Sequence, residues 1–417
     1  MFTKTINLSF IILPLSMILG NFALNLNILL INSFFIFFVV KNNQWNWCKL
    51  SVFKLLILLY LFQIFNSIYN YFHNPAYGYE GLLRSIGFVK FIFFVFSFQY
   101  LINKKEQLDK IFKGWIIIIS VVIFDVFFES IFGHNIFGFK SKDYTRIISF
   151  FYNENVVGAF LLAFSFTVCL FYLNKDLTFK KRLFINIIFF LIPLAILVSG
   201  ERSNFLKCLI LFSLILIFIQ SNKLIISKLN ISFLITFVLL ISIIFVPNIF
   251  IKQTEFFFRI LKANNTEKFV DKFQNIQYLA HYDTAWNIFK DFPVNGVGSK
   301  NFRIECAKEK YFNNNLKFSS RRCSTHPHQI HFELLSEHGI IGYLLFFYLI
   351  LSFTFNNLRR SNDIFNKGLN FYLLIFLIPI LPGGSIFSSF NGSLFWIIFA
   401  LANYAQKSNQ SDKFLDK

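Results

Sequence analysis

Apolar and polar positions follow one another along this chain in long blocks. The apolar blocks approach the about 20 residues that a helix needs to cross a bilayer, and they recur from end to end. The first block leads into further apolar sequence without an A-x-A-like cleavage site, so we expect it to be retained as a helix. The pattern predicts about twelve membrane spans, at residues 6–20, 23–40, 51–70, 85–102, 112–131, 155–173, 183–199, 204–220, 231–248, 338–355, 369–381 and 384–404.

Composition agrees with this pattern. Hydrophobic residues make up 56% of the 417 residues and charged residues only 15%, whereas about 25% of the residues of soluble domains are charged. A soluble fold could not cover so much apolar surface. The sequence therefore indicates an all-α polytopic membrane protein.

The formal net charge of +19 could suggest a nucleic-acid partner, but its distribution favours another explanation. Most Lys and Arg of the short connections fall in alternate segments, as cytoplasmic loops require. The pattern predicts that both termini are cytoplasmic, and no nucleic-acid partner is expected.

The connection between the ninth and tenth spans is much longer than the others and is expected to be extracytoplasmic. A connection of this length usually has a function, so we expect a lid or a substrate-binding element. Cys306 and Cys323 share it, and an oxidising compartment would allow them to form a disulfide. The chain divides into 1–248 with transmembrane helices 1–9, 249–337 as the extracytoplasmic loop, 338–404 with helices 10–12, and 405–417 as a cytoplasmic tail.

Four arginines are expected on the extracytoplasmic side, against the usual charge bias. A guanidinium binds phosphate oxygens in a two-pronged fashion, so a cluster there would suit a lipid-linked phosphate or pyrophosphate. For Arg202, in the tight turn "SGERSNFL", we favour phosphate binding. For Arg146 two interpretations are equally open: phosphate binding, or an arginine that snorkels at a helix end. For Arg84 and Arg259 the snorkelling interpretation is preferred.

The stretch "THPHQIHFELLSEHG" is rich in histidine directly before an apolar run. Pro327 places His328 near a helix N-terminus, where the dipole favours the neutral imidazole that a general base requires. His328 and His331 would share one helical face, and Glu333 and Glu337 another. A metal site is the less favoured alternative because HExxH is absent, and a purely structural polar cap is a third. The metal alternative would use His326, His328, His331 and His338.

Four motifs together resemble the O-antigen ligase and polymerase superfamily of bacterial envelope glycosyltransferases. His328-Gln329, nine residues and Gly339-Ile-Ile-Gly342 resemble its H-[NSQ]-x9-G-x-x-G signature. "SGERSNFL" is similar to its Ser/Arg turn, with Arg202 on the arginine. "RIISFFYNENVVGAFLL" is similar to its Arg-led motif through Arg146, Phe151, Asn155 and Gly158, and "WNIFKDFPVNGVGSKNF" to its stretch with Pro293, Gly296 and Gly298. His281 stands about where many relatives have an arginine.

The resemblance implies a C-type glycosyltransferase fold in the bacterial inner membrane, with a periplasmic site and neither metal nor cofactor. It implies a donor glycan on undecaprenyl pyrophosphate, bound through Arg146, Asn155, Arg202 and Arg259, and His328 as the base. Transfer to lipid A–core is preferred. Joining of two lipid-linked repeats and attachment to protein remain open. A flippase or transporter is less expected because polar groups gather at one surface instead of within the spans.

Overall fold

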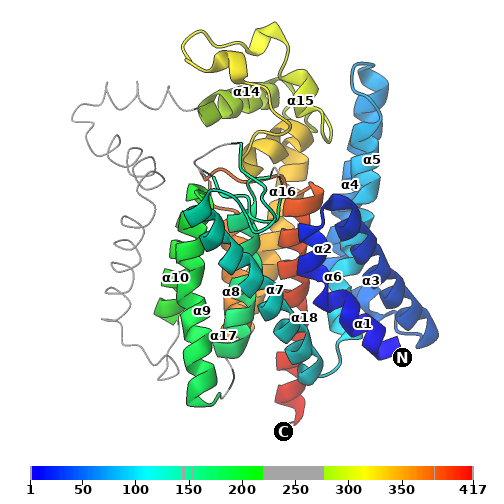
Figure 1. Cartoon of the computed structure of the whole chain (residues 1–417). Helices are drawn as coiled ribbons and strands as arrows, with labels where there is room; N and C mark the ends of the chain where they lie inside the picture. Colours follow the sequence, from blue (N-terminus) through cyan, green and yellow to red (C-terminus); the bar gives the residue numbers. More distant parts are fainter. Residues whose placement is uncertain are drawn as a thin grey trace.

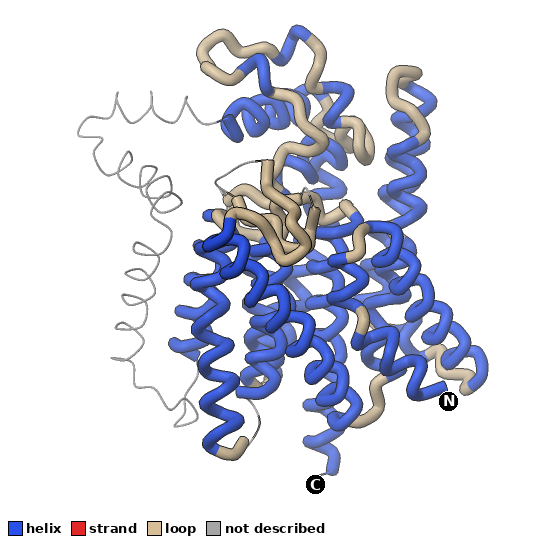
Figure 2. The backbone as a smooth tube through the Cα atoms, viewed as in Figure 1, coloured by secondary structure: helices blue, strands red, loops and turns tan. Residues whose placement is uncertain are grey.

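The computed structural model describes residues 2–142, 146–152, 154–173, 175, 177–218, 277–361, 363–379 and 381–415. In these ranges the regular structure is entirely helical, without a strand (Figure 2). The helices are α1 (Phe2–Ile11), α2 (Leu13–Ile18), α3 (Asn21–Lys41), η1 (Asn46–Lys49), α4 (Ser51–His73), α5 (Glu80–Gly87), α6 (Val89–Leu101), α7 (Lys105–Phe132), α8 (Val157–Leu173), α9 (Phe179–Val198), α10 (Arg202–Phe218), α14 (Gln277–Asp291), α15 (Phe302–Glu305), η2 (Glu309–Tyr311), η3 (Ser319–Arg321), α16 (Ile330–Arg360), α17 (Ile364–Phe376) and α18 (Ser389–Leu415).

Most of these helices form one bundle, seen from the side in Figure 1. Six stretches of the described residues are long and apolar enough to cross a membrane: α3, α4, α5 together with α6, α7, α9 and α16. Two further helices, α8 and α17, are apolar but shorter. Their number and their apolar character indicate a multi-pass membrane protein. The predicted span at 231–248 and Arg259 lie outside the described residues.

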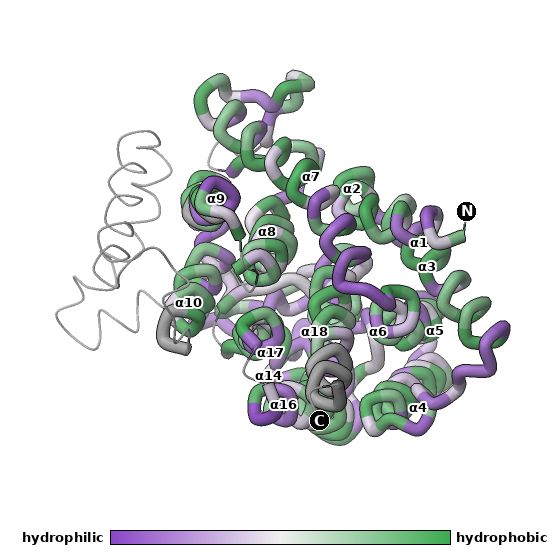
Figure 3. The backbone as a smooth tube through the Cα atoms, turned by 90° about the horizontal axis from the view of Figure 1, so that it is seen from below, coloured by the Kyte–Doolittle hydropathy of each residue, from purple (hydrophilic) through white to green (hydrophobic). Residues whose placement is uncertain are grey.

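The bundle is apolar both inside and on its flank. Almost all of α8 is buried, packed among α7, α9, α17 and α18. Large side chains such as Phe65 and Ile117 are nevertheless exposed on outer helices. Figure 3, seen from the end that bears the C-terminus, shows mostly hydrophobic helices with hydrophilic stretches in the connections. An exposed apolar flank of this extent suits contact with lipid.

A smaller layer built from residues 277–329 lies over the N-terminal end of α16 (Figure 1). Its core also includes Tyr77, from the connection between α4 and α5. The Tyr77 hydroxyl donates a 2.5 Å hydrogen bond to the Glu305 carboxylate, and Tyr311 donates a second one at 3.0 Å. Cys306 and Cys323 form a disulfide within this layer. The α4–α5 connection, which the sequence analysis left out of the outer region, is therefore part of it.

A break in α16 joins this layer to the bundle. Gly339 has φ +61°, so the helical hydrogen bonds are interrupted there. The amide of Ile340 donates to the carbonyl oxygen of Pro293 at 2.8 Å, and the amide of Gly298 donates to that of Glu337 at 2.8 Å. The "PVNGVG" turn thus supplies partners for the peptide groups that the break leaves unpaired.

Close approach explains the glycines of both segments. A Cβ on Gly296, whose φ is +65°, would lie 2.5 Å from the carbonyl carbon of Glu337, and a Cβ on Gly339 would collide with the backbone of Val294. At Gly342 a Cβ would come within 2.7 Å of the Phe62 ring on α4. The two glycine motifs of the sequence are therefore parts of one interlocked structure, which we call the glycine interlock (residues 293–298 with 336–342).

Candidate active site

The segments that contain Arg146, Arg202 and His328 are joined by hydrogen bonds at one end of the bundle. The amide of Ile147 donates to the Ser199 carbonyl at 3.2 Å, which ties the α7–α8 connection to the α9–α10 turn. The Ser203 hydroxyl donates to the Pro382 carbonyl at 2.5 Å. The next amide, that of Gly383, donates to the His328 carbonyl at 2.8 Å. The three predicted site residues thus belong to neighbouring segments.

Glu201 organises the arginine side of this region. One of its oxygens accepts from the Gly158 amide at 2.6 Å, in the first turn of α8, and the other from Asn204 at 2.5 Å. Burial raises the pKa of Glu201, while these hydrogen bonds and the charge of Arg146 act in the opposite direction. A Cβ on Gly158 would lie 3.0 Å from the Glu201 side chain, which explains the glycine of the motif.

Three of the predicted donor-binding residues lie on the segments that meet at this carboxylate. Arg146 is partly exposed, and Arg202 is exposed at the first position of α10. Asn155 is exposed two residues before α8 begins. These positions leave their polar groups accessible from the end of the bundle.

The loop after Arg146 is held by two buried acids of α7 that the sequence analysis missed. The Glu129 carboxylate accepts from the amides of Ile148 at 3.2 Å and Ser149 at 2.6 Å. Asp125 accepts from the Ser149 hydroxyl at 2.6 Å. Acids near the end of the predicted span 112–131 were the available signal, because such groups are rare in spans and usually have a partner.

His328 precedes α16 and is not part of it. Its φ is +59°, and the cap of α16 is Gln329, whose side-chain oxygen accepts from the amides of His331 at 2.6 Å and Phe332 at 3.1 Å. The prediction that His328 and His331 share a helical face was therefore wrong. The His331 nitrogens lie 2.9 Å from the Tyr343 hydroxyl and 2.8 Å from the Leu377 carbonyl, so this ring braces the loop after α17.

The His328 ring lies in an aromatic and histidine-rich setting. Its Nε2 is 2.8 Å from the Ser324 hydroxyl, and its ring centroid is 4.3 Å from that of His326 and 5.4 Å from that of His281. Burial first, and then these two histidines, lower the pKa of His328 to about 3. The imidazole is thus uncharged at neutral pH and can accept a proton. His281, at the position where the motif departs from the family pattern, adjoins this ring.

Lys207 is a second site candidate that the sequence analysis missed. It lies on α10 one turn after Ser203 and is only 5% exposed. Among the described residues its ammonium has neither a hydrogen-bond acceptor nor a carboxylate within bonding distance, and it lies 5.4 Å from the Phe376 ring. A Cβ on Gly383 would be 3.4 Å from Nζ, which puts the ammonium beside the backbone that contacts His328. A lysine within the predicted span 204–220 was the signal in the sequence.

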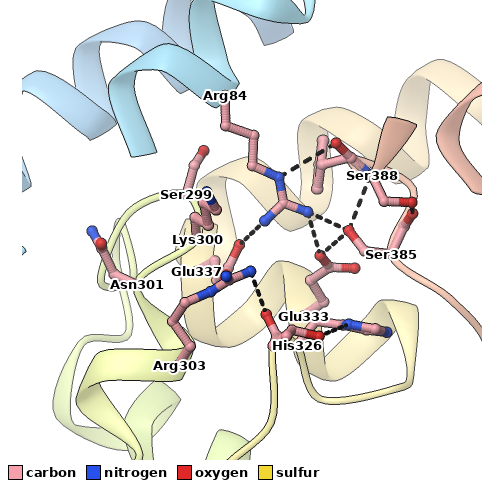
Figure 4. Close-up of polar contacts among 12 residues, drawn as sticks. Arg84, Ser299, Lys300, Asn301, Arg303, His326, Glu333, Glu337, Ser385 and Ser388 are labelled. Carbon is pink, nitrogen blue, oxygen red and sulfur yellow. Dashed lines mark hydrogen bonds and ion pairs between the residues drawn. The ribbon is translucent and has the colours of Figure 1, made fainter. Parts of the chain in front are cut away.

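Arg84 is not the interfacial arginine that the sequence predicted. Its side chain is 14% exposed and forms ion pairs with Glu333 at 3.1 Å and Glu337 at 3.4 Å (Figure 4). It also donates to Ser385, which itself donates to Glu333. Both glutamates are buried, and they share the face of α16 that their spacing predicted. We call Arg84, Glu333, Glu337 and Ser385 the Arg84 cluster.

A pocket of about 480 Å³ opens beside the Arg84 cluster. It lies between α5, the segment before α15, the Thr325–His326 turn and the start of α18. Lys300 in its wall pairs with Glu80 at 2.5 Å, and Arg303 donates to the Thr325 carbonyl at 3.1 Å. Burial lowers the pKa of His326, another wall residue, to about 4. This wall is polar, and His326 separates it from His328.

The chain was also compared with known proteins. No curated protein matches it. A family model described as "O-Antigen ligase" matches residues 187–347, which include Arg202, the glycine interlock and His328. The match covers less than half of the chain, and it supports the O-antigen ligase superfamily.

Proposed function

We propose that this protein transfers a glycan from undecaprenyl pyrophosphate to an acceptor hydroxyl on the extracytoplasmic face of the bacterial inner membrane. The proposal rests above all on the hydrogen bond from the Gly383 amide to the His328 carbonyl at 2.8 Å, because it connects the uncharged imidazole to the segments with Arg202 and Lys207. The family match supports O-antigen ligase-type activity.

In the proposed reaction His328 takes the proton of the acceptor hydroxyl as its oxygen attacks the anomeric carbon. The oxygen attacks on the face opposite the pyrophosphate while the bond from this carbon to the pyrophosphate oxygen breaks, so this single displacement inverts the configuration at the carbon. The leaving pyrophosphate gains negative charge. Cations that the fold already holds at that position stabilise this charge most effectively. Arg146, Arg202 and Lys207 supply these cations, and Asn155 and Arg259 remain predicted contacts of the donor.

Binding of the donor also bears on the base. An imidazole with a pKa of about 3 is a weak base in the empty site. A nearby pyrophosphate favours the charged imidazolium and therefore raises its basicity when the donor is in place. Proton transfer is thereby coupled to donor binding. The proposed reaction needs no metal, so activity in a chelator such as EDTA is expected to equal that without it.

The test uses purified full-length protein with lipid-linked donor. We expect His328→Ala to abolish transfer, and Arg202→Lys to reduce it strongly because an ammonium cannot reproduce the guanidinium fork. His73→Ala, at an exposed histidine of α4, is the matched control and should transfer normally. Normal transfer by His328→Ala and Arg202→Lys would refute this site.

Transfer to lipid A–core is the preferred reaction, and joining of two lipid-linked repeats is the alternative. Deletion of the gene in the native host, followed by separation of lipopolysaccharide on a gel, distinguishes them. Core without repeats means ligation. Core with a single repeat means polymerisation.

A further inference from the structure

The pocket beside the Arg84 cluster has the size and the wall of a small-ligand site. Its volume of about 480 Å³ falls within the about 300–1,000 Å³ typical of such sites. Hydroxyl and amide groups of Thr325, Ser385, Ser388, Ser389 and Asn391 line it, together with the Phe387 ring. Five residues with hydroxyl or amide side chains beside one aromatic ring suit a ligand with many hydroxyl groups, so the wall favours a sugar over a lipid chain.

The cations of the pocket differ in how far they are neutralised. Arg84 faces two carboxylates, and Lys300 faces Glu80. Arg303 has no carboxylate within ion-pair distance in the described part of the chain. Its Nε is buried without a hydrogen-bond partner there, and one Nη donates to the Thr325 carbonyl. Figure 4 shows its guanidinium beside His326 and below Arg84. A guanidinium that has no carboxylate partner and an unpaired Nε can bind an anionic group of a ligand.

The pocket meets the proposed active site at His326. This residue lines the pocket, and its ring lies 4.3 Å from that of His328. The segment with Lys207 and Arg202 also contacts His328, through the Gly383 backbone. A ligand in the pocket and a donor bound by those cations would therefore both lie next to the base.

We propose that this pocket binds an acidic sugar of the acceptor, with its carboxylate or phosphate on Arg303, and so presents a neighbouring hydroxyl to His328. The assignment of this sugar to the acceptor rests on the proposed function. The binding of an acidic sugar rests on the pocket alone. No covalent step occurs in the pocket.

The experiment measures binding without transfer. Ser389→Cys places a thiol in the pocket wall, in full-length protein that also has Cys48→Ser, and its rate of labelling by a maleimide is followed. The probes are galacturonate, glucose 6-phosphate, glucose and inorganic phosphate. At a sugar concentration of about four times Kd, labelling should slow about fivefold with either acidic sugar. Lys290→Cys, at an exposed position of α14, is the matched control and should be labelled at the same rate throughout.

Two further variants separate the outcomes. Arg303→Gln with Ser389→Cys should lose the protection by acidic sugars. His328→Ala with Ser389→Cys should keep it, even though transfer is lost, so failure of the pocket and failure of the proposed reaction give different results. Equal protection by glucose, protection by inorganic phosphate alone, or none by either acidic sugar would overturn the proposal.

Discussion

Arg84 and Lys207 are both largely buried cations at the same end of the bundle, but they differ in the groups that surround them. Arg84 is matched by Glu333, Glu337 and Ser385. Lys207 is more deeply buried, and in the described residues no acceptor lies within bonding distance of its ammonium. Glu201, which acts on Lys207 electrostatically, uses both oxygens for Gly158 and Asn204. A matched buried charge can hold segments together, whereas an unmatched one is costly unless a ligand completes it.

Removing the matched cation should give the largest effect on stability. Arg84→Met leaves Glu333 and Glu337 buried without their partner, and loss of one member of a buried pair costs about 3–5 kcal/mol. We expect a correspondingly lower midpoint of denaturant unfolding in detergent. Arg359→Met, at an exposed arginine near the other end of α16, is the control and should leave the midpoint unchanged.

A triple variant tests the cause. Arg84→Met combined with Glu333→Gln and Glu337→Gln removes all three charges, and its midpoint should recover much of the loss. An Arg84→Met protein as stable as wild type would show that the matched cluster does not hold α5 to α16.

Removing the unmatched cation should affect function instead. Lys207→Met retains the shape of the side chain and removes a buried charge without a partner, so the midpoint should stay the same or rise. Loss of a charge-assisted bond to the donor is worth about 1.5–3 kcal/mol, so transfer should fall by about tenfold to a hundredfold. Inorganic pyrophosphate should stabilise wild type against heating more than it stabilises the variant.

Lys175→Met is the matched control because Lys175 pairs with Asp109 at 2.6 Å, at the far end of α8. It should transfer normally. If Lys207→Met transfers normally and responds to pyrophosphate like wild type, Lys207 belongs to the packing and not to the donor site.

The sequence predicted the parts of the fold that depend on local apolar content. The predicted run 112–131 lies within α7, and 183–199 lies within α9 except for its last residue, since burial in a membrane depends mainly on length and composition. It did not predict the break at Gly339, because an apolar run reads the same with or without an interruption. Nor did it place Tyr77 in the outer layer, since the partner of Tyr77 is 228 residues further along the chain.

In the candidate site, too, the sequence predicted what local motifs determine and missed what distant contacts determine. Arg202 and Gly158 were found because short motifs surround them, and the structure adds that Glu201 connects the two. Arg84 was misjudged because its partner Glu333 lies 249 residues away. From the sequence alone, a lone arginine at a helix start and a pair of glutamates before a span each have a plausible separate explanation. The spatial pairing is what decides between them.

The glycine interlock allows a separate test of the Arg84 cluster, because it positions Glu337 of that cluster and does not include Lys207. Gly339→Ala puts a side chain at a positive φ and against Val294, and such strain costs about 1–3 kcal/mol. The unfolding midpoint should fall accordingly. The control is Gly87→Ala on α5, where a Cβ would meet nothing within 4 Å. A Gly339→Ala protein at least as stable as the control would contradict the role of the break.

The smallest expected effect concerns the pH dependence of transfer, because neither Arg84 nor Lys207 is among the causes of the lowered pKa of His328. Burial, His326 and His281 hold the pKa at about 3, below the ordinary 6.5. A lowered pKa means that the base stays unprotonated as pH falls, until pH approaches that value. Because kcat/KM reports the free enzyme, its acid limb should stay flat from about pH 8 to about pH 5.

The comparison between the cations makes this prediction sharper. Lys207→Met should slow transfer at every pH without moving the acid limb, whereas His326→Ala should move the limb upward because one of the neighbouring histidines is gone. The measurement is kcat/KM for transfer across this pH range in all three proteins. A wild-type profile that falls by half near pH 6.5 would mean that His328 titrates as an exposed histidine, and that the enclosed ring beside His326 and His281 is not the form that reacts.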